Sequence, residues 1–404
     1  MKKTILLMGG ANVPAVREAA ERRGYDIIAI NFAEAVERLE PEPSIIHAEG
    51  MDFANLMGAQ RRLIELHRHY HYEAIVPTSE YGLLASSMAA RALGLPYTPL
   101  EAVANTRDKV RMRRVLESKG LAQVRFRSCT AVGEVRAFLD EIGGPIIVKP
   151  LLGTGSDGVS RVDSQEQVEN AWRITGAARS FGGVICEEYI DGPEFSIEAY
   201  LVDGEFFPVA ITDKQTDARF LEIGHSQPTL LSEQVQQQVF DKTREILLAL
   251  GITHGVTHTE MRVSPTRGPV LIETHTRMGG DLIHVLSKIT TGVDLADLIV
   301  ACSLGERPNV RPRNTGTAAA VRFVSGPAGV ITSMDVPAVD EANGVRESRP
   351  YVGVGHEATG RSATLDRFGH VLTTGATRHE ADARADETVA RFRVTVGEKE
   401  AVAV

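Results

Sequence analysis

The segment Leu271–Ile283, LIETHTRMGGDLI, places a carboxylate, an imidazole and a guanidinium at alternate positions. Side chains two residues apart on an extended strand project from the same face, so Glu273, His275 and Arg277 would share one face. A strand face that belongs to a core carries Val, Ile and Leu, because an isolated buried ion is too costly. This charged face therefore needs a partner, and the pattern predicts a cation at Glu273 and an anion at Arg277.

A second acidic strand comes just before this one in the sequence. A hairpin with a four-residue loop at Pro265–Gly268 places Glu260 opposite Glu273 on the same face. Directly opposed residues have Cβ atoms about 4.5–5.5 Å apart. Two carboxylates that close repel unless one is protonated or a cation lies between them. Hard oxygen ligands favour Mg²⁺ over a transition metal. A register shifted by one residue is the alternative, but it leaves the other charged residues of the hairpin unexplained.

A glycine-rich segment, LLGTGSDGV, follows an apolar strand that ends at Lys149. Gly153, Gly155 and Gly158 allow positive φ and close backbone approach, so successive N–H groups can form an anion nest. Ser156 adds a hydroxyl donor. The spacing is neither a P-loop nor a dinucleotide fingerprint. A flexible hairpin loop is the alternative, but a lysine beside the loop favours phosphate binding.

The segment 184–194, VICEEYIDGPE, is an apolar strand that passes into two acids, an aromatic residue and a turn. Such a segment can hydrogen-bond an adenine edge through its backbone, with Glu194 accepting from ribose hydroxyls. A plain strand-to-turn exit with solvated acids explains these residues equally well.

The remaining pattern separates two kinds of structure. Residues 1 to about 105 alternate strands and helices, which predicts a small α/β domain with a parallel sheet. Asn105 or Thr106 is expected to cap a helix that runs through Ser118. Residues 311–378 are rich in Gly, Val and Thr, which predicts an antiparallel sheet, followed by a charged helix and a tail.

Charge and composition exclude several classes of protein. A net charge of -9 argues against binding to bulk nucleic acid or to anionic membrane. The three cysteines are far apart with no CxxC pair, so neither a disulfide framework nor a zinc site is indicated. The apolar run of MKKTILLMGG is too short for a secretion signal, and no stretch approaches transmembrane length, which predicts a cytoplasmic protein.

Taken together, these residues resemble the ATP-grasp superfamily of carboxylate–amine ligases. The strings GVTHTEMR and LIETHTRMGGD are most similar to bacterial L-amino-acid ligases, the dipeptide-forming enzymes related to the one in bacilysin synthesis. The resemblance implies an α/β and α+β protein with the ATP-grasp fold. It implies a Rossmann-like α/β domain at 1–105, a small lobe with a linker helix at 106–190, a large lobe with the metal site at 191–310, and a mainly antiparallel sheet domain at 311–404.

The resemblance also implies roles for individual residues. The implied ATP-binding residues are Lys109, Lys149, Gly153, Gly155, Ser156, Gly158, Glu187, Glu188, Tyr189, Ile190 and Glu194. Glu260 and Glu273 match the metal-binding acids. Glu222 and His225 stand where the dipeptide ligases meet the N-terminal amino acid. Catalytic Arg277, with Gly279 and Gly280, stands where they hold the activated carboxyl. His275 departs from the superfamily, where an Asn usually helps to bind a second metal, so the number of metals stays open.

The implied activity is that of an ATP-dependent ligase. It activates an amino-acid carboxylate as an acyl phosphate and couples it to an amine, giving a dipeptide or amide, ADP and phosphate. The implied cofactor is Mg²⁺, with Mn²⁺ as a substitute, and the resemblance favours a homodimer and a role in antibiotic biosynthesis. The alternatives are an ATP-grasp ligase for another acid and amine pair and a non-catalytic nucleotide-binding regulator. A dehydrogenase rests only on Gly9-Gly10, for which a structural turn is the better interpretation.

Overall fold

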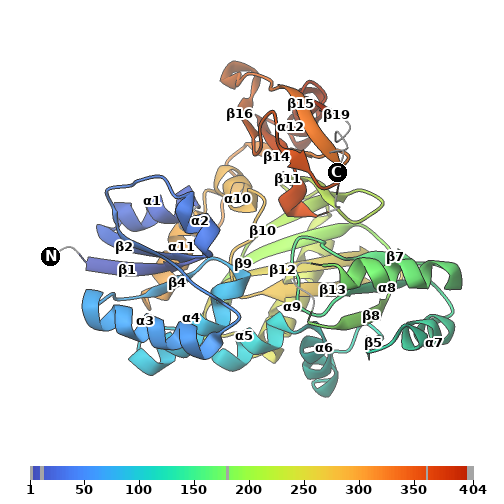
Figure 1. The fold of residues 1–404 in the computed structure, drawn as a ribbon, viewed down its shortest axis with the longest axis horizontal. Coiled ribbons are helices and arrows are strands. Elements are labelled where there is room, and N and C mark those ends of the chain that lie inside the picture. Colours follow the sequence, from blue (N-terminus) through green and yellow to red (C-terminus); the bar gives the residue numbers. More distant parts are fainter. Residues whose placement is uncertain (1–2, 10–12, 179–181, 361–362, 398–404) are drawn as a thin grey trace, which may run out of the picture.

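The computed structural model describes residues 3–9, 13–178, 182–360 and 363–397. Its strands form four sheets. Figure 1 shows the N-terminal parallel sheet on the left, a large sheet in the centre and a smaller four-stranded sheet on the right. None of the helices in the described ranges combines the length and apolar composition that crossing a bilayer requires.

The N-terminal sheet is parallel, with strand order β3-β2-β1-β4. Its first strand is apolar on both faces because helices cover both sides of the sheet. Ile5 and Leu7 belong to one buried cluster, and Leu6 and Met8 belong to another. Gly9 takes a φ of +86° at the end of this strand, and Gly10 lies outside the described residues. The elements of this part are β1 (Lys3–Met8), α1 (Pro14–Arg22), β2 (Tyr25–Asn31), α2 (Ala33–Glu37), β3 (Ile45–Gly50), α3 (Leu56–Tyr70), β4 (Ile75–Pro77), the 3₁₀ turn η1 (Glu80–Gly82) and α4 (Leu83–Leu93).

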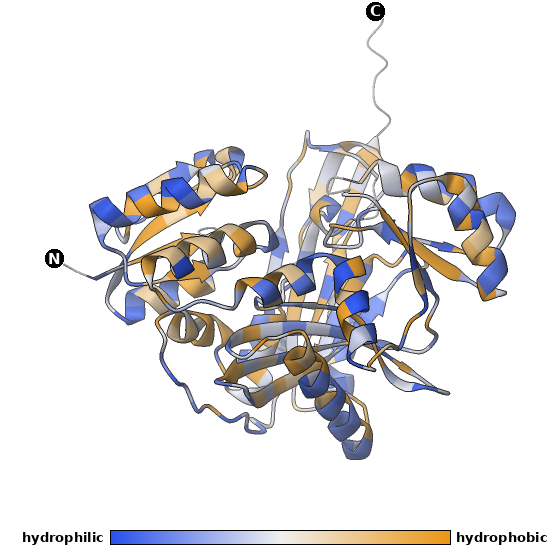
Figure 2. Ribbon diagram, turned by 90° about the horizontal axis from the view of Figure 1, so that it is seen from below, coloured by the Kyte–Doolittle hydropathy of each residue, from blue (hydrophilic) through white to orange (hydrophobic). Residues whose placement is uncertain are grey.

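Two helices connect the N-terminal sheet to the rest of the chain. Helices α10 (Ile283–Thr291) and α11 (Leu295–Ser303) follow β13 (Gly268–His275) in the sequence, and α11 packs against α1. Leu295 and Ile299 of α11 share a buried cluster with Val16 of α1 and Val76 of β4. In Figure 2 the helices beside this sheet show orange and blue stripes, as amphipathic helices do. This packing places η1 next to the large sheet.

A linker of two helices follows the N-terminal part and differs from the expected single helix. The helices are α5 (Leu100–Arg107) and α6 (Lys109–Ser118). The predicted cap at Asn105 or Thr106 is wrong, because both residues lie inside α5. The cap of α6 is Asp108, whose side chain accepts from the Arg111 amide at 2.9 Å. Lys109 is therefore the first residue of a helix.

The small sheet is antiparallel, with strand order β5-β8-β6-β7. Helices α7 and α8 cover one of its faces and enclose a buried apolar cluster. The elements are β5 (Phe126–Cys129), α7 (Val132–Ile142), β6 (Ile146–Pro150), β7 (Ser160–Val162), α8 (Val168–Gly176) and β8 (Val184–Glu188). The glycine-rich segment joins β6 to β7, so the expected strand before the glycines is confirmed.

The large sheet has eight antiparallel strands in the order β13-β12-β9-β10-β11-β14-β18-β16. One face is apolar, and its Phe195, Ile197 and Leu201 pack with residues of α9. The alternate residues of the same strand, Ser196 and Glu198, lie on the opposite face. The elements are β9 (Glu194–Val202), β10 (Glu205–Thr216), β11 (Glu222–Gln227), α9 (Glu233–Ala249), β12 (Gly255–Ser264), β13 (Gly268–His275), β14 (Ala318–Val324), β16 (Val345–Pro350) and β18 (Gly369–Gly375).

The C-terminal segment is rich in strands, as expected, but β14, β16 and β18 extend the large sheet. β14 pairs with β11 in antiparallel register and covers what would otherwise be an exposed sheet edge. A separate three-stranded sheet contains β15 (Gly329–Asp335), β17 (Glu357–Ala358) and β19 (Arg393–Gly397), and helix α12 (Arg378–Val389) packs on β14 and β18. The expected charged helix is confirmed, whereas β19 occupies part of the expected tail.

Candidate functional site

The hairpin of β12 and β13 places Glu260 directly opposite Glu273, which confirms the predicted pairing. The turn is shorter than predicted, because Ser264 already pairs with Gly268. The register shifts between Glu260 and Met261, so Ile272 is an extra residue in β13 and forms a β-bulge.

Because of the bulge, β13 directs one side chain into the apolar core and another into the cleft. Leu271 belongs to the buried apolar cluster under the sheet, whereas Glu273, only two residues later, lines the cleft. Without the extra residue both side chains would share one face. Arg113 of α6 donates to the carbonyl oxygens of Leu271 and Ile272 at 2.9 Å each, and so holds the bulge.

Each of the two opposed acids is paired with a lysine. Lys109 Nζ lies 3.0 Å from Glu273 Oε2, and Lys214 Nζ lies 2.8 Å from Glu260 Oε1. Burial alone would raise the pKa of Glu260, but Lys214 and His258 lower it to about 2. Burial opposes ionisation of Glu273 as well, and Lys109 and His275 bring its pKa well below the usual value. Two ionised carboxylates in register supply the hard oxygen ligands that fit Mg²⁺.

Lys214 of β10 is the centre of a buried ionic cluster that the sequence did not reveal. Its ammonium lies 3.0 Å from Glu194, 2.6 Å from Glu222 and 2.8 Å from Glu260, and its side chain is 1% exposed. The available signal was a lysine in the middle of the mostly apolar strand PVAITDKQT. Such a buried cation needs several acids around it.

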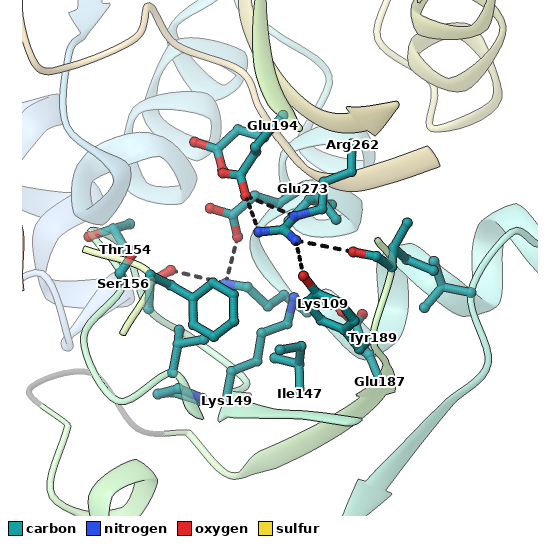
Figure 3. Close-up of a pocket in the computed structure, with 18 of the residues that line it drawn as sticks. Lys109, Ile147, Lys149, Thr154, Ser156, Glu187, Tyr189, Glu194, Arg262 and Glu273 are labelled. Atoms are coloured by element: carbon teal, nitrogen blue, oxygen red, sulfur yellow. Dashed lines mark hydrogen bonds and ion pairs between the residues drawn. The ribbon is translucent and has the colours of Figure 1, made fainter. Parts of the chain in front are cut away.

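A cavity lies between the small sheet and the large sheet, and Figure 3 shows the residues around it. Ile147, Ile190 and Ile272 give it apolar walls, and Lys109, Lys149 and Glu273 line it as well. Lys109 Nζ also donates to the carbonyl oxygen of Gly153 at 3.0 Å, which ties the glycine-rich segment to this cavity. An apolar slot that ends in lysines, a glycine loop and acids fits the base, phosphates and metal of a nucleotide.

The residues expected to bind adenine and ribose line this cavity. Three of them accept hydrogen bonds from Arg262, and a fourth accepts from Arg125. Tyr189 and Glu194 both bind Arg262, with the Tyr189 hydroxyl accepting at 2.9 Å and Glu194 Oε2 at 3.1 Å. The Ile190 carbonyl oxygen also accepts from Arg262, at 3.1 Å. Glu188 accepts instead from the Arg125 amide, at 2.9 Å.

Glu187 is held by two cations. Its Oε1 lies 2.6 Å from Arg113 Nε, and its Oε2 lies 2.7 Å from Lys149 Nζ. Burial would raise the pKa of Glu187, but these two neighbours lower it to about 2. The carboxylate of Glu187 therefore fixes the position of the Lys149 ammonium group.

The glycine-rich segment differs in one detail from the predicted conformation. Gly155 and Gly158 have φ values of +66° and +82°, but the third left-handed residue is Ser156, at +59°, rather than Gly153. The Gly155 carbonyl oxygen accepts from the Thr364 amide at 3.1 Å. The segment thus meets a loop of the C-terminal part, which contains the 3₁₀ turn η4 (Thr364–Asp366).

A second cavity adjoins the first, and both are lined by Glu260, Glu273 and the segment 153–155. Its other lining residues include Glu80, Glu222, Arg277, Gly280 and Asp281. Arg277 Nε donates to Glu80 Oε2 at 3.0 Å, so η1 of the N-terminal part fixes the guanidinium. Neither Glu80 nor Asp281 was predicted as a site residue.

Two residues expected to contact substrate lie behind this cavity. His225 is fully buried, with Nε2 3.6 Å from Glu222 and 3.7 Å from Asp281. Burial opposes protonation, but these two carboxylates raise the pKa of His225. The Gly279 amide donates to the buried Glu198 at 3.2 Å, whereas Gly280 lines the cavity.

Arg367 was also missed in the sequence. Its Nη1 lies 2.9 Å from Asp281 Oδ1, and its Nη2 donates to the Glu222 carbonyl oxygen at 2.8 Å. This arginine comes directly after η4 and is buried, so it joins the C-terminal loop to the acids of the second cavity.

The sequence matches two protein families. Residues 142–285 match the ATP-grasp domain, and residues 322–397 match L-amino acid ligase C-terminal domain 2. Alanine--anticapsin ligase of Bacillus subtilis (strain 168) is 28% identical over 262 residues, which are 59% of this chain and 55% of that protein. The uncharacterized protein y4rH of Sinorhizobium fredii is 27% identical over 374 residues, 87% of this chain and 77% of the relative. The chain spans about half of the length of the alanine--anticapsin ligases that it matches.

The fold matches solved structures over nearly the whole chain. The crystal structure of an L-amino acid ligase from Bacillus licheniformis superposes with a TM-score of 0.84 at 23% identity, covering 98% of this chain and 99% of the other. Phosphoribosylglycinamide synthetase from Anaerococcus prevotii superposes with a TM-score of 0.72 at 16% identity, covering 98% and 100%. At these identities the likeness concerns the fold alone.

Proposed function

This chain has the ATP-grasp fold and carries an ATP-grasp domain at residues 142–285, and from this premise we propose that it is an ATP-dependent carboxylate–amine ligase. In the proposed reaction an amino-acid carboxylate attacks the γ-phosphate of ATP, giving an acyl phosphate and ADP. An amine then displaces phosphate and forms an amide, with a dipeptide as the expected product.

One observation carries this proposal. The cavity between the small and large sheets and the second cavity share Glu260, Glu273 and residues 153–155 of the glycine-rich segment in their linings. A phosphoryl group at this junction would have the nucleotide on one side and an acid substrate on the other. Transfer needs mainly positioning and neutralised charge, because the protein does little covalent chemistry in such a step.

The residues around the junction have separate tasks in this proposal. Lys109 and Lys149 line the nucleotide cavity and supply positive charge for the phosphates, and the amides of the glycine-rich segment supply donors. Mg²⁺ held by Glu260 and Glu273 would neutralise charge on the triphosphate. The contact of Gly155 with Thr364 covers the junction, which would keep the acyl phosphate from water.

The second cavity has features that fit two substrate groups. Arg277 is oriented by Glu80 and would neutralise the acyl phosphate and the oxyanion that forms when the amine attacks. The carboxylates of Glu222 and Asp281 line the same cavity and would attract the ammonium group of an amino acid. A zwitterionic amino acid therefore suits the charges of this cavity.

The proposal is tested with a pairwise panel of amino acids and amines, incubated with ATP and Mg²⁺. Mass spectrometry would detect new amides, and a coupled assay would detect ADP. We expect at least one pair to give equal amounts of amide and ADP. ADP release that no acid stimulates, with no amide from any pair, would contradict a ligase.

We further propose a cytoplasmic location and a homodimer, which rest on the resemblance to L-amino acid ligases. Sedimentation of the full chain tests the second point, and a monomer at micromolar concentration would contradict it.

A further inference from the structure

Glu198 is a fully buried carboxylate in the interior of the large sheet. It lies on β9, which pairs with β10 on one side and with β12 on the other. A charged group away from water is costly unless close partners hold it. Within the described ranges, the recorded hydrogen bonds of its side chain go to His258, at 2.5 Å, and to the Gly279 amide, at 3.2 Å. His258 lines the second cavity, and Gly279 precedes Gly280, which lines it as well.

The contact with Glu198 leaves no room for a side chain at position 279. A Cβ added at Gly279 would come 2.8 Å from His258 Nδ1 and 3.1 Å from each carboxylate oxygen of Glu198. Glycine allows a backbone to approach another group this closely. The sequence therefore has at this position the residue that lets the amide reach the carboxylate.

The turn that follows Gly279 is strained. Asp281 and Leu282 have φ values of +53° and +63°. This conformation is uncommon for residues other than glycine, and for a bulky residue such as Leu282 it is an outlier. Strain of this kind persists where surrounding contacts hold the backbone, and it clusters at ligand-binding sites. The hydrogen bond from the Gly279 amide to Glu198 is a buried contact of this kind at the start of the turn.

The turn belongs to the second cavity and not to the first. Gly280 and Asp281 line the second cavity, and Arg277 lines it from the same segment. Asp281 Oδ1 also lies 2.9 Å from Arg367 Nη1. The residues 278–282, all of which the structure describes, are absent from the lining of the cavity between the small and large sheets. A displaced turn would therefore change the cavity proposed for the amino acid and leave the cavity proposed for the nucleotide in place.

We propose that Glu198 is a positioning residue for the amino-acid substrate, and that its carboxylate holds the turn 278–282 through the Gly279 amide. In this arrangement the turn places Gly280 and Asp281 beside the substrate. This inference rests on the proposed function, because it assumes that the second cavity takes the amino acid.

A second route from Glu198 leads to the proposed metal site. His258 contacts Glu198 through Nδ1 and Glu260 through Nε2, the latter at 3.1 Å. Glu260 has a further partner in Lys214, at 2.8 Å, so its position does not depend on this route. Loss of the Glu198 carboxylate should thus weaken binding of the amino acid and leave binding of the nucleotide unchanged.

Two variants of the full chain separate the hydrogen bond from the charge. Glu198→Gln keeps an oxygen that can accept from the Gly279 amide, whereas Glu198→Met removes it. Hydrogen exchange, followed by mass spectrometry, should become faster in peptides that cover 278–282 of Glu198→Met and stay near wild type in Glu198→Gln. Glu205→Met, at the exposed start of β10, is the control for loss of a carboxylate and should exchange as the wild type does. Unchanged exchange over 278–282 in Glu198→Met would overturn the proposal.

Gly279→Ala tests the same contact from its other side and guards against a Glu198→Met protein that fails to fold. The added Cβ would push the turn away from the carboxylate, so exchange over 278–282 should become faster here as well. Gly133→Ala is the control, because nothing lies within 4 Å of a Cβ added at Gly133. Equal exchange in both glycine variants would contradict the role of the contact.

Steady-state kinetics distinguish positioning from a general structural role. Loss of a hydrogen bond to a charged acceptor should raise the KM for the amino acid roughly 10–100-fold in Glu198→Met. The KM for ATP should stay near the wild-type value, and Glu198→Gln should recover most of the affinity for the amino acid. An equal rise of both KM values would mean that Glu198 supports the whole cleft or acts through Glu260, and would overturn the positioning role.

The positioning role and the ligase proposal fail in different ways. Calorimetric titration with amino acids, in the presence of Mg²⁺ and a non-hydrolysable ATP analogue, measures substrate binding without turnover. Wild-type protein that binds an amino acid in a Glu198-dependent manner but never forms ADP would overturn the ligase and leave the role of Glu198 standing. Wild-type turnover that Glu198→Met leaves unchanged would do the reverse. Wild-type protein that neither binds nor converts any amino acid would overturn both.

Discussion

Arg113 and Glu187 form a buried ion pair, with 2.6 Å between Nε and Oε1, that connects the two sheets of the cleft. The same guanidinium holds the bulge of β13, and the same carboxylate holds Lys149. The position of Lys149 in the small sheet is thus linked to the register of Glu260 and Glu273 in the large sheet. This link consists of the Arg113 guanidinium and the Glu187 carboxylate, so it is direct.

The free energy of unfolding should decrease at acid pH, because carboxyls such as Glu187 become protonated. The pKa of Glu187 is about 2 in the folded protein, against 4.5 as the ordinary value. A carboxyl with a lowered pKa contributes stability above its unfolded pKa and loses it as pH falls through the folded pKa. The free energy of unfolding, measured with denaturant, should therefore be steady above about pH 5 and decrease from about pH 4.5 toward 2. In Glu187→Gln this acid dependence should be smaller, and an unchanged slope would contradict the assignment.

Lys214→Met should destabilise the protein when no metal or nucleotide is bound. It leaves three glutamates without their shared cation, and removing one partner of a buried ion pair costs about 3–5 kcal/mol. The melting temperature should fall, and Mg²⁺ with ADP should restore more of it than in the wild type. Lys242→Met on the surface of α9 is the matched control. Among the described residues, Lys242 forms an ion pair only with Glu245, which is partly exposed. An equal response of both variants would rule out the role of Lys214.

Arg277→Ala should lower both ADP release and amide formation. Loss of one donor to a developing oxyanion typically costs about 10²–10³ in rate. Arg346→Ala, which removes a half-exposed arginine of β16, serves as the control for loss of a guanidinium. If both products of Arg277→Ala form at the wild-type rate, this arginine does not act in the reaction.

Much of the fold could be predicted from the sequence, because its signals are local. The alternation of strands and helices in residues 1 to about 105 indicated a parallel sheet, and LIETHTRMGGD indicated a charged strand face. The motifs led to the ATP-grasp fold, which the structural matches confirm. The pairing of Glu260 with Glu273 is also confirmed, although the predicted loop was one residue too long and a bulge at Ile272 compensates for it. The roles given to individual site residues stay predictions.

The rest of the site could not be predicted, because its contacts join distant parts of the chain. Glu80 lies 195 residues from His275, and Arg367 lies 145 residues from Glu222. Neither residue belongs to a motif, and periodicity gives no information about which elements pack together. In the sequence Lys214 is a lysine within a strand, and only the fold shows that three acids surround it.

Gly155→Ala should uncouple ATP hydrolysis from amide formation. Gly155 has a φ of +66°, and an added Cβ would come 3.0 Å from the side chain of Thr364. The substitution strains the glycine-rich segment and pushes it away from the C-terminal loop, so water should reach the acyl phosphate. Gly120→Ala is the control, because Gly120 has a φ of +73° with nothing within 4 Å of an added Cβ. The ratio of ADP to amide, measured with a productive substrate pair, should rise in Gly155→Ala and stay near one in Gly120→Ala. The left-handed strain of about 1–2 kcal/mol is common to both variants, so a difference between them reports the contact with Thr364. The same ratio in both would mean that this contact does not protect the intermediate.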